Sequence, residues 1–265
     1  MTDTARDTMP AWAALALRLV DSVSFEAPGK RVLRVYHAVN FHKIITGFLI
    51  LAMMWFYNNW SVAAWVYLAL HGIYGYCWLI KDFGFRDHQL ESGISVPGII
   101  GLYLGLIALY WIIPWLFISR HVEPGAIALF FAVSLHTLGV VTMIAADCQR
   151  HFTLKYRKGL IRDGMFRYTR NPNYLGEVML YSAYAFLANH WLAWLIIAYM
   201  TFFAFLPRLY RKDVSLSRHP GWAEYKARSG LLVPWALING RALADLLRGG
   251  PDEDKSGPAE GRESA

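Results

Sequence analysis

Long apolar segments alternate with short polar ones along most of this chain. They occupy residues 44–57, 62–80, 97–118, 125–146 and 174–206. The third and fourth are close to the ~20 residues with which a helix crosses a bilayer. The last is too long for one crossing, and the polar pair Asn189-His190 divides it into a predicted helical hairpin. The pattern therefore predicts six membrane spans.

Hydrocarbon admits only helices and closed barrels as spanning structures, because every backbone polar group must be satisfied internally. We therefore expect an all-α protein, a polytopic membrane bundle of about six transmembrane helices. Ahead of it, Trp12 to Val23 forms a short apolar stretch that predicts an amphipathic helix in the membrane interface. The stretch after Gly249 is rich in Gly, Pro, Glu and Ser, which is typical of disorder.

Basic residues lie on one side of this predicted bundle. The loops 81–91 and 147–173 and the segment after Arg208 share that side. The middle loop alone carries Arg150, Lys155, Arg157, Lys158, Arg162, Arg167 and Arg170, whereas the opposite loops carry only Arg120. The positive-inside rule places the basic side, and with it both termini, in the cytoplasm. We expect a bacterial inner membrane protein.

Composition supports a membrane protein and argues against nucleic-acid binding. Apolar residues make up 56% of the 265 residues, against about 45–50% in soluble domains. The net charge of +7 comes largely from loops interleaved with the spans, which suits contact with membrane lipids rather than a nucleic-acid module. The two cysteines, Cys77 and Cys148, form no metal-ligand pattern and lie in a reducing compartment, so neither a metal site nor a disulfide is expected.

The segment 164–177, GMFRYTRNPNYLGE, leads from the basic loop into the fifth span. Asn171 precedes Pro172 and is therefore biased away from helix, so a new helix is expected to begin near Asn173 with its free N–H groups facing the loop. Glu177 lies one turn further on the face of Asn173 and Tyr174. A carboxylate carried into a membrane indicates a functional site. Alternatively, Asn173 only caps the helix and Glu177 pairs with a loop arginine.

The arginines of the same loop are candidates for a phosphate-bearing ligand. Arg150, Arg167 and Arg170 carry guanidinium groups that bind phosphate bidentately. The alternative is contact with lipid headgroups, which the topology alone explains.

These residues carry a resemblance to a known superfamily. The run from Arg170 to Glu177, the apolar hairpin and the later Glu224-Tyr225 and Leu232-Val233-Pro234 resemble the C-terminal domain of steroid 5α-reductases. They also resemble bacterial reductase-like membrane proteins and the sterol C14/C7 reductases. The stretch Asp147-x-Gln149-Arg150 is similar to the Asp-x-Gln-Lys of the bacterial relatives, and isoprenylcysteine carboxyl methyltransferases share a cousin of the motif.

The resemblance implies an NADPH site. Asn173 and Glu177 would hold the nicotinamide end, Tyr225 and Arg228 would close over the cofactor, and the three loop arginines would meet its phosphates. The implied cofactor-binding set is Asp147, Arg150, Arg167, Arg170, Asn173, Tyr174, Glu177, Tyr225 and Arg228. The chain is accordingly expected to divide into four parts. They are an N-terminal segment 1–43, helices on the substrate side over 44–124, a cofactor domain 125–235 and a disordered tail 236–265.

Two departures count against the methyltransferases. Asn171 stands where many bacterial relatives and the methyltransferases carry His. Arg208 is followed by Leu209-Tyr210-Arg211-Lys212-Asp213, without the paired glutamates that the methyltransferases usually place there.

Candidate acids lie in the second span. Tyr67, His71, Tyr74 and Trp78 follow a helical stripe. We take His71 and Tyr74 as the candidate catalytic residues, because a His-Tyr pair facing the bundle can polarise a carbonyl and donate a proton. The alternative is that these groups, like His136 in the fourth span, are only hydrogen-bonded core residues.

Three functions remain open from the sequence. The first is reduction of an activated C=C bond in a lipophilic, steroid-like or isoprenoid substrate by NADPH. The second is methyl transfer from S-adenosylmethionine to a lipid or prenylated carboxylate. The third is non-catalytic lipid binding, since a fold does not specify a reaction. The sequence carries no signal for a particular oligomeric state.

Overall fold

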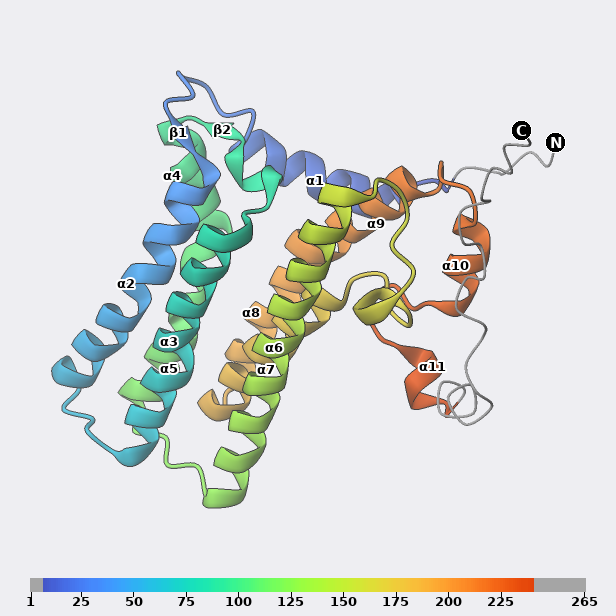
Figure 1. The fold of residues 1–265 in the computed structure, drawn as a ribbon. Coiled ribbons are helices and arrows are strands. Elements are labelled where there is room, and N and C mark those ends of the chain that lie inside the picture. Colours follow the sequence, from blue (N-terminus) through green and yellow to red (C-terminus); the bar gives the residue numbers. More distant parts are fainter. Residues whose placement is uncertain (1–6, 241–265) are drawn as a thin grey trace, which may run out of the picture.

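The computed structural model describes residues 7–240, and in this part of the chain nearly all regular structure is helical (Figure 1). The long helices are α1 (Ala11–Val23), α2 (Val35–Phe56), α3 (Val62–Phe85), α4 (Val96–Gly105), α5 (Ile112–Ser119), α6 (Ala126–Tyr156), α7 (Pro172–Ala188), α8 (Trp191–Met200) and α9 (Leu206–Leu216). The shorter elements are α10 (Trp222–Arg228), α11 (Trp235–Ile238), η1 (His88–Glu91), η2 (Ile107–Trp111), η3 (Gly164–Phe166) and η4 (Thr201–Phe205). Strands β1 (Leu33–Arg34) and β2 (Gly93–Ile94) form a small antiparallel pair.

The predicted all-α, polytopic bundle is confirmed. Among the described residues, α2, α3, α6 and the run Trp191–Leu216 are each long and apolar enough to cross a membrane. Helices α4 and α5, bent by about 40° at their junction, give a fifth if the pair is one span. Helix α7 has 17 residues, or about 25 Å at 1.5 Å per residue, slightly short of the ~30 Å hydrocarbon core. Helix α7 is therefore not among the four to five candidate spans of the described residues, and it pairs with α8.

The hairpin between α7 and α8 turns where the sequence predicts. Asn189 ends α7 in the left-handed conformation, with φ of 46°. The His190 side chain then accepts a hydrogen bond from the Leu192 N–H at 3.1 Å and caps α8. Asparagine tolerates the left-handed region better than most residues, so these two polar residues stop one helix and start the next.

The two ends of the bundle carry different elements, and the segments predicted to be basic lie at the same end. Figure 1 shows α1, α9, the β1–β2 pair and the C-terminal end of α6 at one end, and the α2–α3 and α5–α6 turns at the other. Helix α1 packs on α4, η4 and α9 through Ala13, Ala16, Leu17 and Val20, and its opposite face, including Leu15 and Leu19, is exposed. This exposed apolar face agrees with the predicted interfacial helix.

Several predicted boundaries differ from the structure. Helix α6 continues to Tyr156 rather than ending at residue 146, so Arg150 and Lys155 lie on this helix and not in the predicted loop. The first span begins at Val35 rather than at residue 44, because the side chain of His37 accepts from the Arg34 N–H and caps the helix earlier. Helix α11 falls within the predicted tail 236–265, and residues 241–265 of that tail lie outside the described residues.

Helices α6 and α7 make the most extensive interhelical contact of the described elements, and glycines bring them together. A Cβ on Gly176 would come within 2.6 Å of the Met143 nitrogen, and one on Gly139 within 2.7 Å of the Gly176 oxygen. Small residues allow such close backbone approach in membrane bundles. The contact holds the start of α7 against the middle of α6.

We predict opposite signs for two Gly→Ala substitutions. Gly176→Ala should lower the thermal midpoint in detergent, because overpacking costs about 1–3 kcal/mol. Gly84→Ala, where no atom lies within 4 Å of the new Cβ, should leave the midpoint unchanged or raise it slightly, since Ala is favoured over Gly in a helix. Equal midpoints for the two variants would contradict the proposed packing role of Gly176.

Candidate functional site

A cavity of about 670 Å³ opens at the end of the bundle near α1 and η1. Its walls come from α2, α3, the α4–η2 junction, α7 and the η4–α9 segment, with Asp147 of α6 beside α7. The volume falls within the roughly 300–1,000 Å³ of small-molecule and cofactor sites. Helices from many parts of the sequence thus line a single pocket in the basic end of the bundle.

The beginning of α7 forms one polar wall. Helix α7 starts at Pro172, whose fixed φ suits the first helical position. The sequence suggests Asn173 as a cap of this helix. In the structure Asn173 is instead the second residue of the helix. Its buried Oδ1 has no hydrogen-bond partner among the described residues. Glu177, one turn further, lines the same cavity, and the structure described here gives its carboxylate no hydrogen-bond or ion-pair partner.

A chain of ion pairs joins α6 to α3 and to the residue that caps η1. The Lys81 ammonium lies 2.8 Å from the Asp147 carboxylate, and both side chains are buried. Arg150, one turn along α6, lies 3.2 Å from Asp147 and 2.6 Å from Asp87. Each buried charge in this chain meets a charge of opposite sign, which a low-dielectric interior requires.

Asp87 stays ionised at the outer end of this chain. Partial burial alone would raise its pKa, but the Arg150 guanidinium and the Gln89 N–H outweigh burial and lower the pKa below its ordinary value. The Asp87–Arg150 pair therefore persists at neutral pH.

The opposite wall is apolar and irregular. Leu106 interrupts the helix between α4 and η2, and η4 is a single π-helical turn. Leu102, Leu106, Ile107, Met200 and Phe205 line the cavity from these two breaks. Tyr199 donates to the Gly105 carbonyl at 3.0 Å and satisfies the broken end of α4. Such π-turns are frequent at functional sites, and this wall suits a lipophilic ligand.

The predicted cofactor residues divide into two groups. Asp147, Asn173, Tyr174 and Glu177 line the cavity together. Arg150 stands directly behind them on Asp147. Arg167, Arg170, Tyr225 and Arg228 lie outside the described lining: Arg167 is half-buried against the Tyr168 ring, and the exposed Arg228 is 3.8 Å from Glu224. The roles of all these residues remain predictions.

Arg170 joins the motif loop to the C-terminal segment. Its guanidinium lies 3.1 Å from the Asp213 carboxylate and also donates to the Ser229 carbonyl. The backbone N–H of Arg170 donates to the Gly230 carbonyl at 2.9 Å. The Asn171 side chain donates to the Leu231 carbonyl at 2.8 Å and accepts from the Lys212 ammonium at 2.9 Å. The C-terminal segment folds back over the loop, as the sequence predicts.

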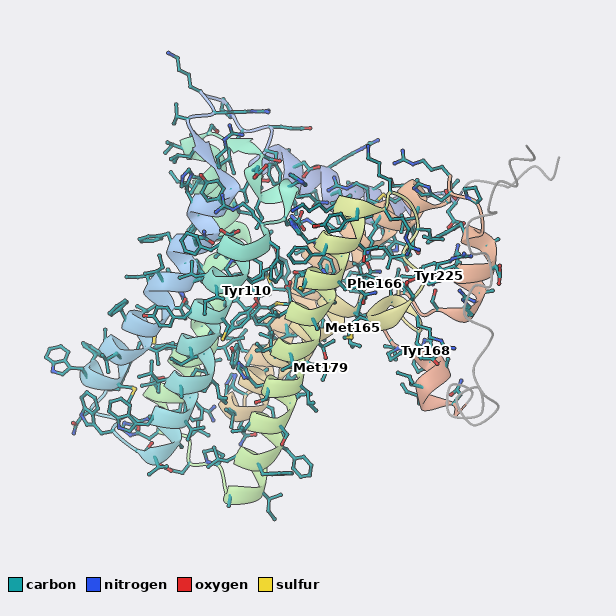
Figure 2. All side chains as sticks on the ribbon, in the orientation of Figure 1. Tyr110, Met165, Phe166, Tyr168, Met179 and Tyr225 are labelled. Atoms are coloured by element: carbon teal, nitrogen blue, oxygen red, sulfur yellow. The ribbon has the colours of Figure 1, made fainter. Side chains whose placement is uncertain are left out.

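Tyr225 completes this clamp. Figure 2 shows Phe166, Tyr168 and Tyr225 together beside the bundle, away from Tyr110 within it. The Tyr225 hydroxyl donates to the Phe166 carbonyl at 2.7 Å. Burial raises the pKa of Tyr225 to about 12, so the hydroxyl keeps its proton for this bond. In the structure these residues hold the loop that precedes α7.

The predicted catalytic pair lies behind the cavity rather than in its described lining. The His71 ring stacks on Tyr184 at 4.1 Å, and its Nδ1 has no partner in the described chain. The Tyr74 hydroxyl lies 3.4 Å from the Tyr181 hydroxyl. Tyr181 lines the cavity, so the Tyr74 hydroxyl is linked to the cavity through Tyr181.

Several polar lining residues escaped the sequence prediction, among them Lys43, Lys81, Tyr181, Arg208 and Arg211. Lys43 and Lys81 border apolar segments and read as the ends of spans. Both lysines, however, lie inside helices and are buried. An ionisable residue placed within a predicted span would have indicated a functional site.

One family model matches part of the chain. Residues 99–228 match the family model described as "Protein of unknown function (DUF1295)". The family is one of steroid 5α-reductase-like membrane proteins. A segment of 41 residues is 37% identical to an uncharacterized protein of Schizosaccharomyces pombe, covering 16% of this chain and 15% of the yeast protein. No solved structure matches the chain.

The cavity fits a dinucleotide cofactor at its polar wall. The unpartnered Asn173 oxygen and the Glu177 carboxylate can accept from an amide or ribose donor. Arg208 and Arg211 line the cavity from α9 and can meet phosphates. The donor and acceptor groups present therefore match both ends of such a molecule.

We predict that Arg170→Ala destabilises the protein. The substitution leaves Asp213 buried without its partner, and breaking a buried pair costs about 3–5 kcal/mol. Arg167→Ala serves as the matched control, because Arg167 is half-buried and contacts chiefly the Tyr168 ring. Thermal unfolding in detergent measures both. An unchanged midpoint for Arg170→Ala, with weaker cofactor binding, would instead assign Arg170 to the ligand.

Proposed function

We propose that this protein is an integral membrane oxidoreductase that uses NADPH to reduce an activated C=C bond in a lipophilic, steroid-like or isoprenoid substrate. The observation that carries the proposal is the joining of two walls in one cavity. Asn173 and Glu177 form a polar wall with unsatisfied acceptors, and residues at the α4–η2 and η4 breaks form an apolar wall of the same cavity. The family match supports the same reading.

The cofactor would take the polar wall. Asn173 and Glu177 would accept from the nicotinamide carboxamide or the adjacent ribose and so orient the ring. The phosphates would meet Arg208 and Arg211 more readily than Arg170, because Asp213 already occupies the Arg170 guanidinium. Arg150 would act through Asp147, which it holds in place beside α7.

Bound NADPH supplies a hydride. The residues of the chain bind and orient the reactants and keep water away. The apolar side chains of Leu102, Leu106 and Phe205 would hold the substrate body and exclude water from the reacting carbon. Tyr74, the acid predicted from the sequence, would act through the Tyr181 hydroxyl that faces the cavity.

Methyl transfer from S-adenosylmethionine is the second candidate, because Asn173 and Glu177 equally suit a ribose or an amine. The paired glutamates expected after the hairpin are absent from the described α9, where Asp213 is engaged by Arg170. This favours the reductase. Lipid binding without catalysis would need no unsatisfied acceptors at Asn173.

We predict that NADPH, and not S-adenosylmethionine, raises the melting temperature of the protein purified in detergent. Ligand at about 100 times its Kd stabilises by roughly 2.7 kcal/mol. Glu177→Gln and Asn173→Ala should each remove most of this shift, because both delete acceptors from the polar wall. Lys155→Met, on the exposed end of α6, is the control and should retain the shift.

A shift with S-adenosylmethionine alone would move the assignment to methyl transfer. A shift with neither compound would favour lipid binding. Wild-type NADPH affinity in Glu177→Gln would remove the motif from the site.

We further predict that both termini and the motif loop face the cytoplasm of a bacterial inner membrane. The basic end of the bundle carries α9, η1 and the end of α6, and the positive-inside rule places such an end inside. Reporter domains fused after Ser61, Arg120 or Asn189 should therefore give periplasmic signals. A cytoplasmic signal at Asn189 would contradict the hairpin as a membrane re-crossing.

A further inference from the structure

An apolar run near the end of the described chain is left uncovered by the rest of the fold. Residues 231–238, LLVPWALI, are consecutive apolar residues, and none of them is buried against the rest of residues 7–240. The run ends in α11, where the side chains of Trp235, Leu237 and Ile238 are 58%, 51% and 63% exposed. Contact of such a run with water is unfavourable, and exposed apolar patches mark protein or membrane interaction sites.

Helix α11 lies beside the bundle at the level of its spans. Figure 1 shows α11 level with the middle of α6 and α7, and not with the end of the bundle where α1 and α9 lie. Met179, in the second turn of α7, is labelled at the same level in Figure 2. Met179 follows Pro172, the first residue of α7, by about 10 Å along the helix at 1.5 Å per residue. Interfacial helices bury their apolar face to a similar depth of about 5–10 Å.

Several backbone groups of this segment are already paired. The carbonyls of residues 230–232 accept hydrogen bonds from residues 169–171 of the motif loop at 2.8 to 2.9 Å. The N–H groups of Trp235 and Leu237 donate to carbonyls within the run, and Pro234 has no N–H to satisfy. Unpaired backbone groups are what keep irregular backbone out of lipid. The pairing therefore lowers the cost of placing this segment in the boundary region of a bilayer.

The charges around the run suit the cytoplasmic leaflet of a membrane. No charged residue occurs over residues 229–240, and arginines bound this stretch at positions 228 and 241. Figure 2 shows Tyr168 beside α11, and the Arg167 guanidinium lies over the Tyr168 ring at 5.3 Å. Tryptophan is enriched at membrane interfaces, and cations next to an apolar segment are attracted to anionic headgroups.

The surroundings of the bundle at this level are lipid. Helices α2, α3 and α6 are long and apolar enough to cross a membrane, so an element beside their middle parts faces the bilayer rather than bulk water. Among possible occupants of the exposed face of α11, lipid is the one whose presence the neighbouring spans require. An apolar segment with cations at its borders is complementary to it.

We propose that residues 231–238 are a membrane anchor that inserts into the cytoplasmic leaflet of the bilayer. Trp235, Leu237 and Ile238 enter the acyl-chain boundary, and the arginines on either side of the uncharged stretch meet the headgroups. Because the backbone before α11 is paired with the motif loop, the anchor fixes the loop that precedes α7 relative to the membrane surface. This proposal does not depend on the reaction assigned to the cavity.

The experiment measures the depth of a nitroxide on Leu237→Cys in the full-length protein, with Cys77 and Cys148 replaced by serine. The protein is placed in vesicles of phosphatidylethanolamine and phosphatidylglycerol. Power saturation of the electron paramagnetic resonance signal then reports collisions with oxygen, which concentrates in lipid, and with a water-soluble nickel chelate. We expect the label to be reached by oxygen and protected from nickel. Leu138→Cys, an exposed position on α6 within the fourth predicted span, is the lipid reference, and Lys158→Cys in the exposed loop is the water reference.

Each outcome decides the matter. Accessibilities that match those of the Leu138 label support the anchor. Access to nickel equal to that of the Lys158 label places α11 in water and overturns the proposal. Protection from both reagents shows that protein covers the face, either residues 241–265 or a second copy of the chain, and overturns it as well. Ile238→Cys, on the same exposed helix, gives the measurement if Leu237→Cys fails to fold.

Discussion

Compensation of charge inside an apolar bundle is the constraint on which this structure depends. The chain Lys81–Asp147–Arg150–Asp87 links α3, α6 and η1 through contacts of 2.6 to 3.2 Å. Removing one member would leave a buried charge without a partner, which is far more costly than replacing the whole set. Because Asp147 lies beside the start of α7, the same chain positions the polar wall of the cavity. Stability and site geometry therefore depend on the same side chains.

The start of α7 is held from two sides. Gly139 and Gly176 bring α6 against α7 within the bundle, and outside it the C-terminal segment pairs with the motif loop through Arg170, Asn171 and Gly230. Both constraints act on backbone, so they fix where α7 begins and which way its first turn faces. Asn173 thus lines the cavity, and its buried Oδ1 has no partner among the described residues. A buried acceptor of this kind is tolerated only when other interactions offset the free energy lost on its desolvation.

The fold could be predicted well from the sequence because apolar length and charge asymmetry report directly on a bilayer. The hairpin at Asn189-His190 was predictable because both residues have a local role, one in a left-handed turn and one as a cap. The site could be predicted only in part. Asn173 and Glu177 belong to a contiguous motif. Lys43 and Tyr181 are far apart in sequence and meet only through tertiary packing, so no local sequence pattern predicts their contact.

Arg170 shows why a cationic motif residue is ambiguous in sequence. A guanidinium suits a phosphate and a buried carboxylate equally well, and its choice depends on what the fold brings near. Here α9 delivers Asp213, and the C-terminal segment delivers the Ser229 carbonyl. The arginine is thereby used to hold the loop.

The cavity contains hydrogen-bond donors from outside the motif, and they are separate from the acceptors that the motif provides. Acceptors stand on α7 at Asn173 and Glu177, and Lys43 and Tyr181 line the same cavity, with the Lys43 ammonium over the rings of Tyr74 and Tyr181. If Lys43 and Glu177 were in contact, they would satisfy one another and leave the cavity with no preferred ligand. The structure instead keeps them beyond ion-pair distance, since Lys43 is turned toward Tyr74, Trp78 and Tyr181. The cavity therefore carries unpaired groups of opposite character, an ammonium donor at Lys43 and acceptors at Asn173 and Glu177.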